Sequence, residues 1–408
     1  MKELVFNKWL RWGLINLVFV ALYGTLMRYK IAFSFPFFQQ KHLLHAHSHF
    51  AFSGWISHFI YTALALMLVP YIAKAKQSQY NSIIWINILC SFGMLFSFTA
   101  QGYGLVSISF STLSILISIA YAILFIRDST AMPANNQAKN WAISGLVLNI
   151  ISAAGPLFLA YMMMTKNVNS DGYLGSVYYF LHFQYSGWFF FGCMAIVINL
   201  LKTEIKALKN YFWVFTTTAI ITVFLSLLWL KLPLWLYVIT VIATMVQLAA
   251  WIGLILKFLP TLKQQLQPSQ PLWIKVFLYG AILSMTIKFI LQAISVIPSL
   301  SQLVFGIRPI VIAYLHLVLL GVYSLFILGF CFSRGFFNPT SFAKKAAIGF
   351  FIGVLLNEIF LGIQGMSAFT YTPVPFINEL LVLAAFVLFF SAIGMAISQK
   401  NTKNLQNP

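Results

Sequence analysis

Long apolar stretches alternate with short polar connections along the whole chain. Each stretch holds about 20 residues or more, which is enough for a helix to cross a hydrocarbon core of ~30 Å. Because only helices satisfy their own backbone hydrogen bonds in lipid, the pattern predicts an all-α integral membrane protein with residues 1–408 in a single transmembrane bundle. The twelve stretches lie near 10–31, 47–72, 82–101, 104–126, 141–164, 175–199, 211–230, 233–257, 272–296, 305–332, 344–366 and 374–398.

Composition excludes a soluble domain, since 61% hydrophobic and 8% charged residues leave too little polar surface for a globule of this size. The first apolar stretch is too long for a signal peptide, and no small-residue cleavage site follows it. Cys90, Cys193 and Cys331 occur singly in different stretches, so we expect them to be apolar fillers and not disulfide or metal residues.

Basic residues predict the orientation, because Lys and Arg favour cytoplasmic loops. With the N-terminus inside, Lys288 lies within a stretch and most other basic residues fall on the cytoplasmic side. We therefore expect both termini in the cytoplasm of an inner or plasma membrane. The net charge of +19 is spread over separate short loops, so it predicts membrane lipid and no nucleic acid as a partner. The basic residues left outside are Arg28, Lys30, Lys41, Lys166, Lys231 and Arg308.

A histidine motif recurs at a regular interval. The heptapeptide HFAFSGW that begins at His49 returns as HFQYSGW from His182, and His316 is likewise followed five positions later by a glycine. The intervals of 133 and 134 residues equal four apolar stretches. The chain therefore predicts three pseudo-symmetric four-helix arcs, about 1–139, 140–270 and 271–408, each with a histidine in the outer half of its second helix.

Histidine at these places predicts a cofactor. A neutral imidazole can be buried in an apolar bundle and still offer a lone pair to iron or copper. Haem in particular needs apolar walls and axial imidazoles. The simpler alternative is hydrogen bonding between helices, but polar residues are costly inside membranes and three in register favour a functional role.

The second stretch carries further histidines. On a regular helix His42, His45 and His49 share one face, whereas His47 and His58 lie on the opposite face. The glycine repeat selects His49 as the ligand, and His58 is the chief alternative. His45 or His42 is a candidate for a second metal contact, while we expect His47 to pack or to form hydrogen bonds.

Twelve helices with histidines in the outer halves of helices two, six and ten resemble subunit I of the haem-copper oxidases. The segment YLHLVLLGVY, which starts at Tyr314, is similar to helix ten of the nitric oxide reductase branch. The resemblance implies a low-spin haem b held by His49 and His316, with His182 as one ligand of a non-haem iron or copper. Tyr314 replaces the family's ligand to a second haem, and the histidine pair of helix seven is missing. The implied binuclear site is therefore incomplete.

Charged residues within the stretches fit an outer-half site. We expect Lys288 and Glu358 to form a buried pair, because neither could carry its charge alone. Glu358 or Tyr185 could also complete a metal site at His182, and carboxylate ligation would suit iron better than copper. Arg28 and Arg308 lie at outer ends, where they could bind haem propionates or simply extend to the interface.

The function expected from these features is a b-type haem protein acting in electron transfer, or in binding or reducing O2 or NO, with a cytochrome c-type or other electron donor as partner. Two histidine ligands leave no open iron position, so electron transfer is the more concrete expectation. One alternative is a twelve-span haem and copper protein of nitric oxide tolerance. Another is a cofactor-free transporter with Lys288 and Glu358 as an ion relay. Acidic residues are too few inside the stretches to predict proton pumping.

Overall fold

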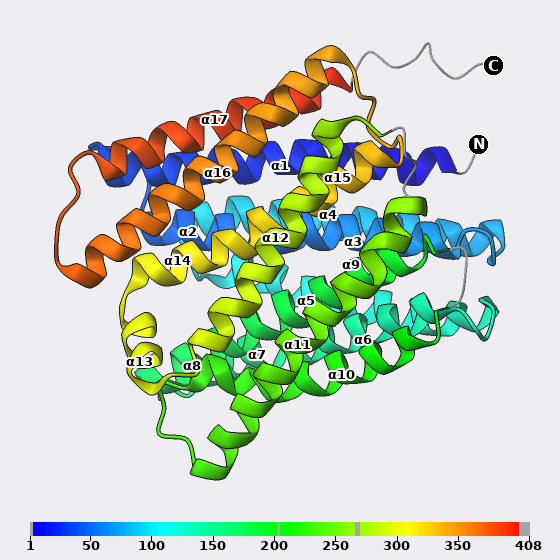
Figure 1. The fold of residues 1–408 in the computed structure, drawn as a ribbon. Coiled ribbons are helices and arrows are strands. Elements are labelled where there is room, and N and C mark those ends of the chain that lie inside the picture. The colour runs from blue at the N-terminus through cyan, green and yellow to red at the C-terminus, as the bar shows by residue number, and fades with distance from the viewer. Residues whose placement is uncertain (1–2, 202–204, 266–269, 400–408) are drawn as a thin grey trace.

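The computed structural model describes residues 3–201, 205–265 and 270–399, and helices account for nearly all of its regular structure. Twelve helices are long and apolar enough to cross a membrane, which confirms the expected class of helical membrane protein. We number them spans one to twelve. Figure 1 shows them packed into one bundle, with the start of α1 and the end of α17 on the same side. Four basic positions assigned to the cytoplasmic side, Lys2, Lys202, Lys400 and Lys403, lie outside the described residues.

Several spans contain more than one helical segment. The elements in chain order are α1 (Glu3–Ala32); α2 (Gln40–Phe50), η1 (Ala51–Ser57) and α3 (His58–Leu68) in span two; α4 (Lys74–Gln101); α5 (Leu105–Asp128) with η2 (Ser129–Ala131); α6 (Gln137–Ser152) with α7 (Ala154–Met164); α8 (Ser170–His182), η3 (Phe183–Trp188) and α9 (Phe189–Ile198) in span six; α10 (Ala207–Ile221) with η4 (Thr222–Leu227); α11 (Leu234–Gln265); α12 (Leu272–Ile294); the short connecting helix α13 (Pro298–Gly306); α14 (Arg308–His316), η5 (Leu317–Ser324) and α15 (Leu325–Ser333) in span ten; α16 (Ser341–Thr370); and α17 (Ile377–Ser398).

Local sequence explains where the helices begin and end. The side chains of Asn169 and Thr340 accept hydrogen bonds from backbone amides in the first turns of α8 and α16. Gly102 ends α4 with a φ of 63°, a conformation that glycine adopts without strain. Some helices begin well before the apolar stretch that predicts them. Helix α2 begins at Gln40 and α4 at Lys74, whereas the stretches begin near residues 47 and 82. Helices continue into the polar interface, whereas the apolar pattern marks only the lipid-embedded part.

Neighbouring spans pack in the order of the chain. Span one packs against span two, span five against span six, and span nine against span ten. The last span, α17, returns to pack against both α16 and α1, so the two ends of the chain close the bundle. Spans two and six are the most enclosed of the twelve, which places two of the three helices with the repeated histidine at the centre.

Spans two, six and ten each contain a π-helical segment directly beside the repeated histidine. The segment η1 begins two residues after His49, and η3 and η5 begin immediately after His182 and His316. A π-helix closes its hydrogen bonds over five residues, is rare, and often lies at functional sites. Among the described residues, the other spans have no such segment.

Side chains satisfy carbonyls within these wider turns. The Asn16 amide donates to the Gly54 carbonyl at 2.6 Å. The Tyr323 hydroxyl donates to the Tyr185 carbonyl, linking η5 to η3. A buried carbonyl without a partner would cost free energy, so these donors stabilise the π-helical geometry.

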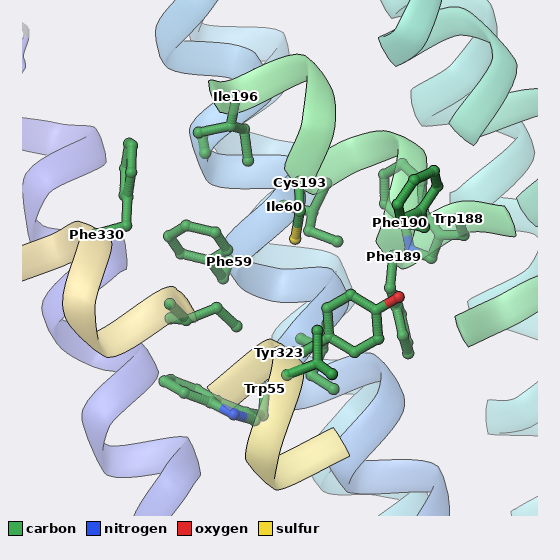
Figure 2. Packing of buried hydrophobic residues seen from close by; sticks show 14 of the residues in the cluster. Trp55, Phe59, Ile60, Trp188, Phe189, Phe190, Cys193, Ile196, Tyr323 and Phe330 are labelled. Atoms are coloured by element: carbon green, nitrogen blue, oxygen red, sulfur yellow. The ribbon is translucent and has the colours of Figure 1, made fainter. Parts of the chain in front are cut away.

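The three central helices are joined by side-chain hydrogen bonds. The Trp55 indole of span two donates to Ser324 of span ten at 2.9 Å, and the Trp188 indole of span six donates to Ser57 of span two at 2.9 Å. Figure 2 shows Trp55, Trp188 and Tyr323 in one cluster of buried aromatic and aliphatic side chains. The centre of the bundle is therefore fixed by directional bonds as well as by packing.

Replacing Ser57 with alanine should lower stability, because the fully buried Trp188 indole N–H then has no acceptor. The cost is about 1–3 kcal/mol for a buried donor left unpaired. Thermal unfolding in detergent should show a lower melting temperature. The control is Ser109→Ala, since Ser109 donates only to its own helix at an exposed position. Equal melting temperatures for the two variants would contradict the role of this bond.

Single cysteines should report the orientation predicted by the basic residues. The native cysteines are buried, so they can be replaced to give a cysteine-free background. Asn167 and Asn135 are exposed in loops at opposite ends of span five. We expect Asn167→Cys to react with a membrane-impermeant maleimide in intact cells, and Asn135→Cys only after lysis. The reverse pattern would place the N-terminus outside.

Candidate haem site and buried polar cluster

The histidines of span two lie on two faces, as helical periodicity predicts. On one face His45 and His49 are directed towards α4 and the loop that follows it. The His49 ring stacks on Phe98 with 4.5 Å between ring centroids, and the His45 ring lies 4.6 Å from Tyr103. His49 also lines a polar cavity of about 80 Å³ between spans two to six.

On the opposite face His47 and His58 are directed towards α1. A Cβ on Gly24 would lie 3.4 Å from the His47 ring, so the glycine allows this close approach. His58 shares a hydrogen bond of 2.7 Å with the Trp9 carbonyl. The Nδ1 atoms of both histidines are buried without a hydrogen-bond partner.

His316 lies beside this second face. Its Nδ1 is 2.8 Å from the Ile312 carbonyl, and because a carbonyl only accepts, Nδ1 carries the proton and Nε2 keeps its lone pair. The electrostatic neighbours of His316 include Arg28 and His47. Groups from spans one, two and ten thus interact electrostatically at this level of the bundle.

This arrangement differs from the predicted pairing of His316 with His49. The electrostatic neighbour of His49 is His45 on its own helix, whereas His47 and His316 interact. His47 and His49 are two residues apart, which corresponds to about 200° around a helix, so the two side chains point in nearly opposite directions. The glycine repeat marks one level along each helix, but η1 begins one residue later after its histidine than η3 and η5 do, so the repeat does not fix which face turns towards span ten.

The outer half of span ten is loosely enclosed. No residue of α14 is buried, although seven of the nine residues of its continuation α15 are. In α2 only Leu43, Ala46 and Phe50 are buried, whereas almost all of η1 is. The histidine-bearing ends of these central helices are therefore less tightly packed than their inner halves.

His182 belongs to a separate buried cluster between spans six, seven, nine and ten. Its Nε2 is 2.8 Å from the Ala219 carbonyl, and its Nδ1 is buried without a partner. Lys288 is an electrostatic neighbour of His182 and donates to the Ser186 hydroxyl at 3.0 Å. No pattern in the sequence predicts this lysine–serine contact, because it depends on the π-helical segment η3.

The expected pair of Lys288 and Glu358 is not formed. Lys288 faces η3 of span six, while Glu358 accepts a hydrogen bond of 3.2 Å from its neighbour Asn357. Throughout the described chain the ion pairs involve Asp128, which is bound by Lys76 at 2.8 Å and by Arg127 at 2.9 Å.

The two outer arginines have different surroundings. Arg28 is half-buried beside His316 and His47, whereas Arg308 is exposed at the start of α14. Of the proposed metal residues, His45 packs among aromatic rings and His58 against α1. No group of three or more His, Cys, Asp or Glu side chains that could hold a metal occurs in the described ranges.

Comparison with known proteins gives no match. Neither a protein-family model nor a curated protein sequence matches this chain. The resemblance to haem-copper oxidases therefore stays a prediction from the residues.

A larger cavity lies away from the histidines. It has a volume of about 480 Å³ and a mostly apolar lining that includes Phe190, Cys193, Met285 and Val322 of spans six, nine and ten. Its lining contains no histidine, so it does not form part of the candidate haem site.

Proposed function

We propose that this protein binds haem b between spans two and ten with His47 and His316 as axial ligands, and that it transfers electrons. The observation that carries the proposal is the electrostatic interaction of His316 with both His47 and Arg28, groups that come from three different spans. Each histidine has a ring nitrogen that makes no hydrogen bond to the protein.

The surrounding residues fit a haem. The Ile312 carbonyl fixes the His316 tautomer, as carbonyls commonly do behind ligating histidines, and so directs Nε2 outward. Gly24 lets His47 sit close to α1, and the loose enclosure of α14 leaves its side chains free to pack on an apolar ring. Arg28 supplies the cation that a propionate requires.

A haem iron held by two imidazoles supplies one-electron chemistry at a closed coordination site. The protein holds the imidazoles, excludes water with the apolar side chains of the central spans, and balances charge through Arg28. These roles favour electron transfer over O2 or NO reduction, which would need an open site. We place this haem protein with the subunit I type of haem-copper oxidases, with the haem in the outer half and an electron donor such as a cytochrome c as partner.

The transporter alternative is less well supported. It needs a charged relay inside the bundle, and Lys288 and Glu358, the pair expected to provide it, are bound to other residues. Nothing in the arrangement of the histidines favours a copper protein of nitric oxide tolerance over the haem proposal.

Changing single histidines tests the ligand assignment. We expect His47→Ala and His316→Ala each to convert the low-spin haem spectrum to high-spin or to lose the haem, because each removes one of two strong-field ligands. His49→Ala is the matched control and should keep the low-spin spectrum, since His49 stacks on Phe98 and faces α4. The measurement is the pyridine haemochrome content and the reduced-minus-oxidised spectrum of protein expressed with ample haem.

Two results would contradict this assignment. Loss of the low-spin signal in His49→Ala but not in His47→Ala would restore the pairing predicted from the repeat. A protein without any Soret band after expression with ample haem would overturn the haem proposal itself.

Arg28→Leu should lower the haem midpoint potential, because removing a nearby positive charge stabilises the more positive ferric state. The expected fall is on the order of tens of millivolts, since ~59 mV corresponds to a tenfold change in a one-electron equilibrium. Arg308→Leu, the same change at an exposed position, should leave the potential almost unchanged. Redox titration of both variants measures these potentials. Equal potentials for the wild type and Arg28→Leu would contradict the assignment of Arg28 to the haem site.

A further inference from the structure

Lys288 is a buried lysine without an acidic partner in the described part of the chain. It lies in α12 with 1% of its surface exposed, and its ammonium group donates to Ser186 and lies 4.1 Å from the centroid of the Phe289 ring. The whole sequence has only six acidic residues, and Glu358, the one expected to pair with Lys288, accepts a hydrogen bond from Asn357. A buried charge that lacks a counter-charge is costly in a membrane bundle.

The charge of Lys288 opposes a second metal at His182. Only the Nδ1 lone pair of His182 is open, because Nε2 is committed to the Ala219 carbonyl. Metal sites in proteins use three or more protein ligands, and a neighbouring ammonium group repels a divalent cation. The metal expected at His182 from the resemblance therefore does not fit the residues present.

We propose that Lys288 and Ser186 form an anion-binding site that takes the place of a second metal beside His182. An ammonium group has three N–H donors, and Ser186 accepts one of them, so two remain for an acceptor. The rings of Phe289 and Tyr185 exclude water around the ammonium group, which strengthens its attraction for a negative charge.

The ligand is a small monovalent anion or a carboxylate group. The local field is positive, and the site lies deep in the bundle, so the anion must be compact and singly charged to enter. Such a negative charge has two sources, a free inorganic anion or the carboxylate of a bound cofactor. The site does not depend on the haem proposal, because its residues belong to spans six and nine.

Thermal unfolding in different sodium salts tests the anion site. We expect the melting temperature of the wild type to rise by about 3 °C or more when 100 mM chloride, bromide or nitrite replaces gluconate, which is too bulky to enter, since a ligand that binds only the folded state stabilises it. Lys288→Met should remove this dependence and should melt higher than the wild type in gluconate. Lys231→Met, the same change at an exposed lysine, should behave as the wild type.

The same titration in haem-loaded and haem-free protein distinguishes the sources. Anion dependence in both preparations indicates a free inorganic anion, whereas dependence only in the haem-free protein indicates that a cofactor carboxylate occupies the site. Equal melting temperatures in all salts and both preparations, or an unchanged dependence in Lys288→Met, would overturn the proposal. If Lys288→Met does not accumulate, Ser186→Ala, which removes only a hydroxyl, should show a reduced dependence.

Metal analysis gives an independent check. We expect non-haem iron and copper to be equally low in the wild type and in His182→Ala, whatever the haem content. If the wild type contains one equivalent of non-haem metal and His182→Ala does not, the proposal that Lys288 takes the place of this metal is wrong. Because haem is measured separately by its pyridine haemochrome, this outcome leaves the haem proposal untouched.

Discussion

Lipid offers no hydrogen bonds, so every polar atom that the central helices bury must find its partner inside the bundle. The wide turns of η1 and η3 meet this demand with donors from neighbouring helices, whereas in η5 the Ser324 hydroxyl donates to the Leu319 carbonyl of the same segment. Asn16 serves the Gly54 carbonyl and Tyr323 serves the Tyr185 carbonyl. The same demand links spans six and ten, because η3 relies on a side chain of η5. The same contacts therefore hold the core helices together and pair their buried polar groups.

Buried polar atoms that lack a hydrogen-bond partner in the bundle mark places where a ligand could bind. Most buried hydroxyls and amides of the central spans are bonded, so the few atoms left over are informative. They include the Nδ1 atoms of His47 and His182. Lys288 adds a charge that a single neutral hydroxyl cannot balance. In the two proposals these regions have opposite needs, since one would offer lone pairs to a haem and the other would offer donors to an anion.

The sequence predicted the fold class well, because hydrophobic length is a property of each segment alone. The regular spacing of His49, His182 and His316 also matches the positions of the three π-helical segments, each of which begins one or two residues after its histidine. The sequence did not predict that His316 interacts with His47 and not with His49, because the spacing of the repeat does not determine which helix face turns towards a neighbour. Nor did it predict the partner of Lys288, which is set by how span six rotates against span nine. Charge alone suggests Glu358 as the partner of Lys288, whereas in the structure Lys288 donates to Ser186.

The seam between spans six and ten has unequal ends. The Tyr323 hydroxyl ties η5 to η3, while its ring lines the cavity of about 480 Å³ beside Phe190 and Val322. Well-packed protein is hardly compressible, and hydrostatic pressure favours states that eliminate voids. Compression should therefore be absorbed at the cavity, while the hydrogen-bonded contact between η3 and η5 keeps its dimensions.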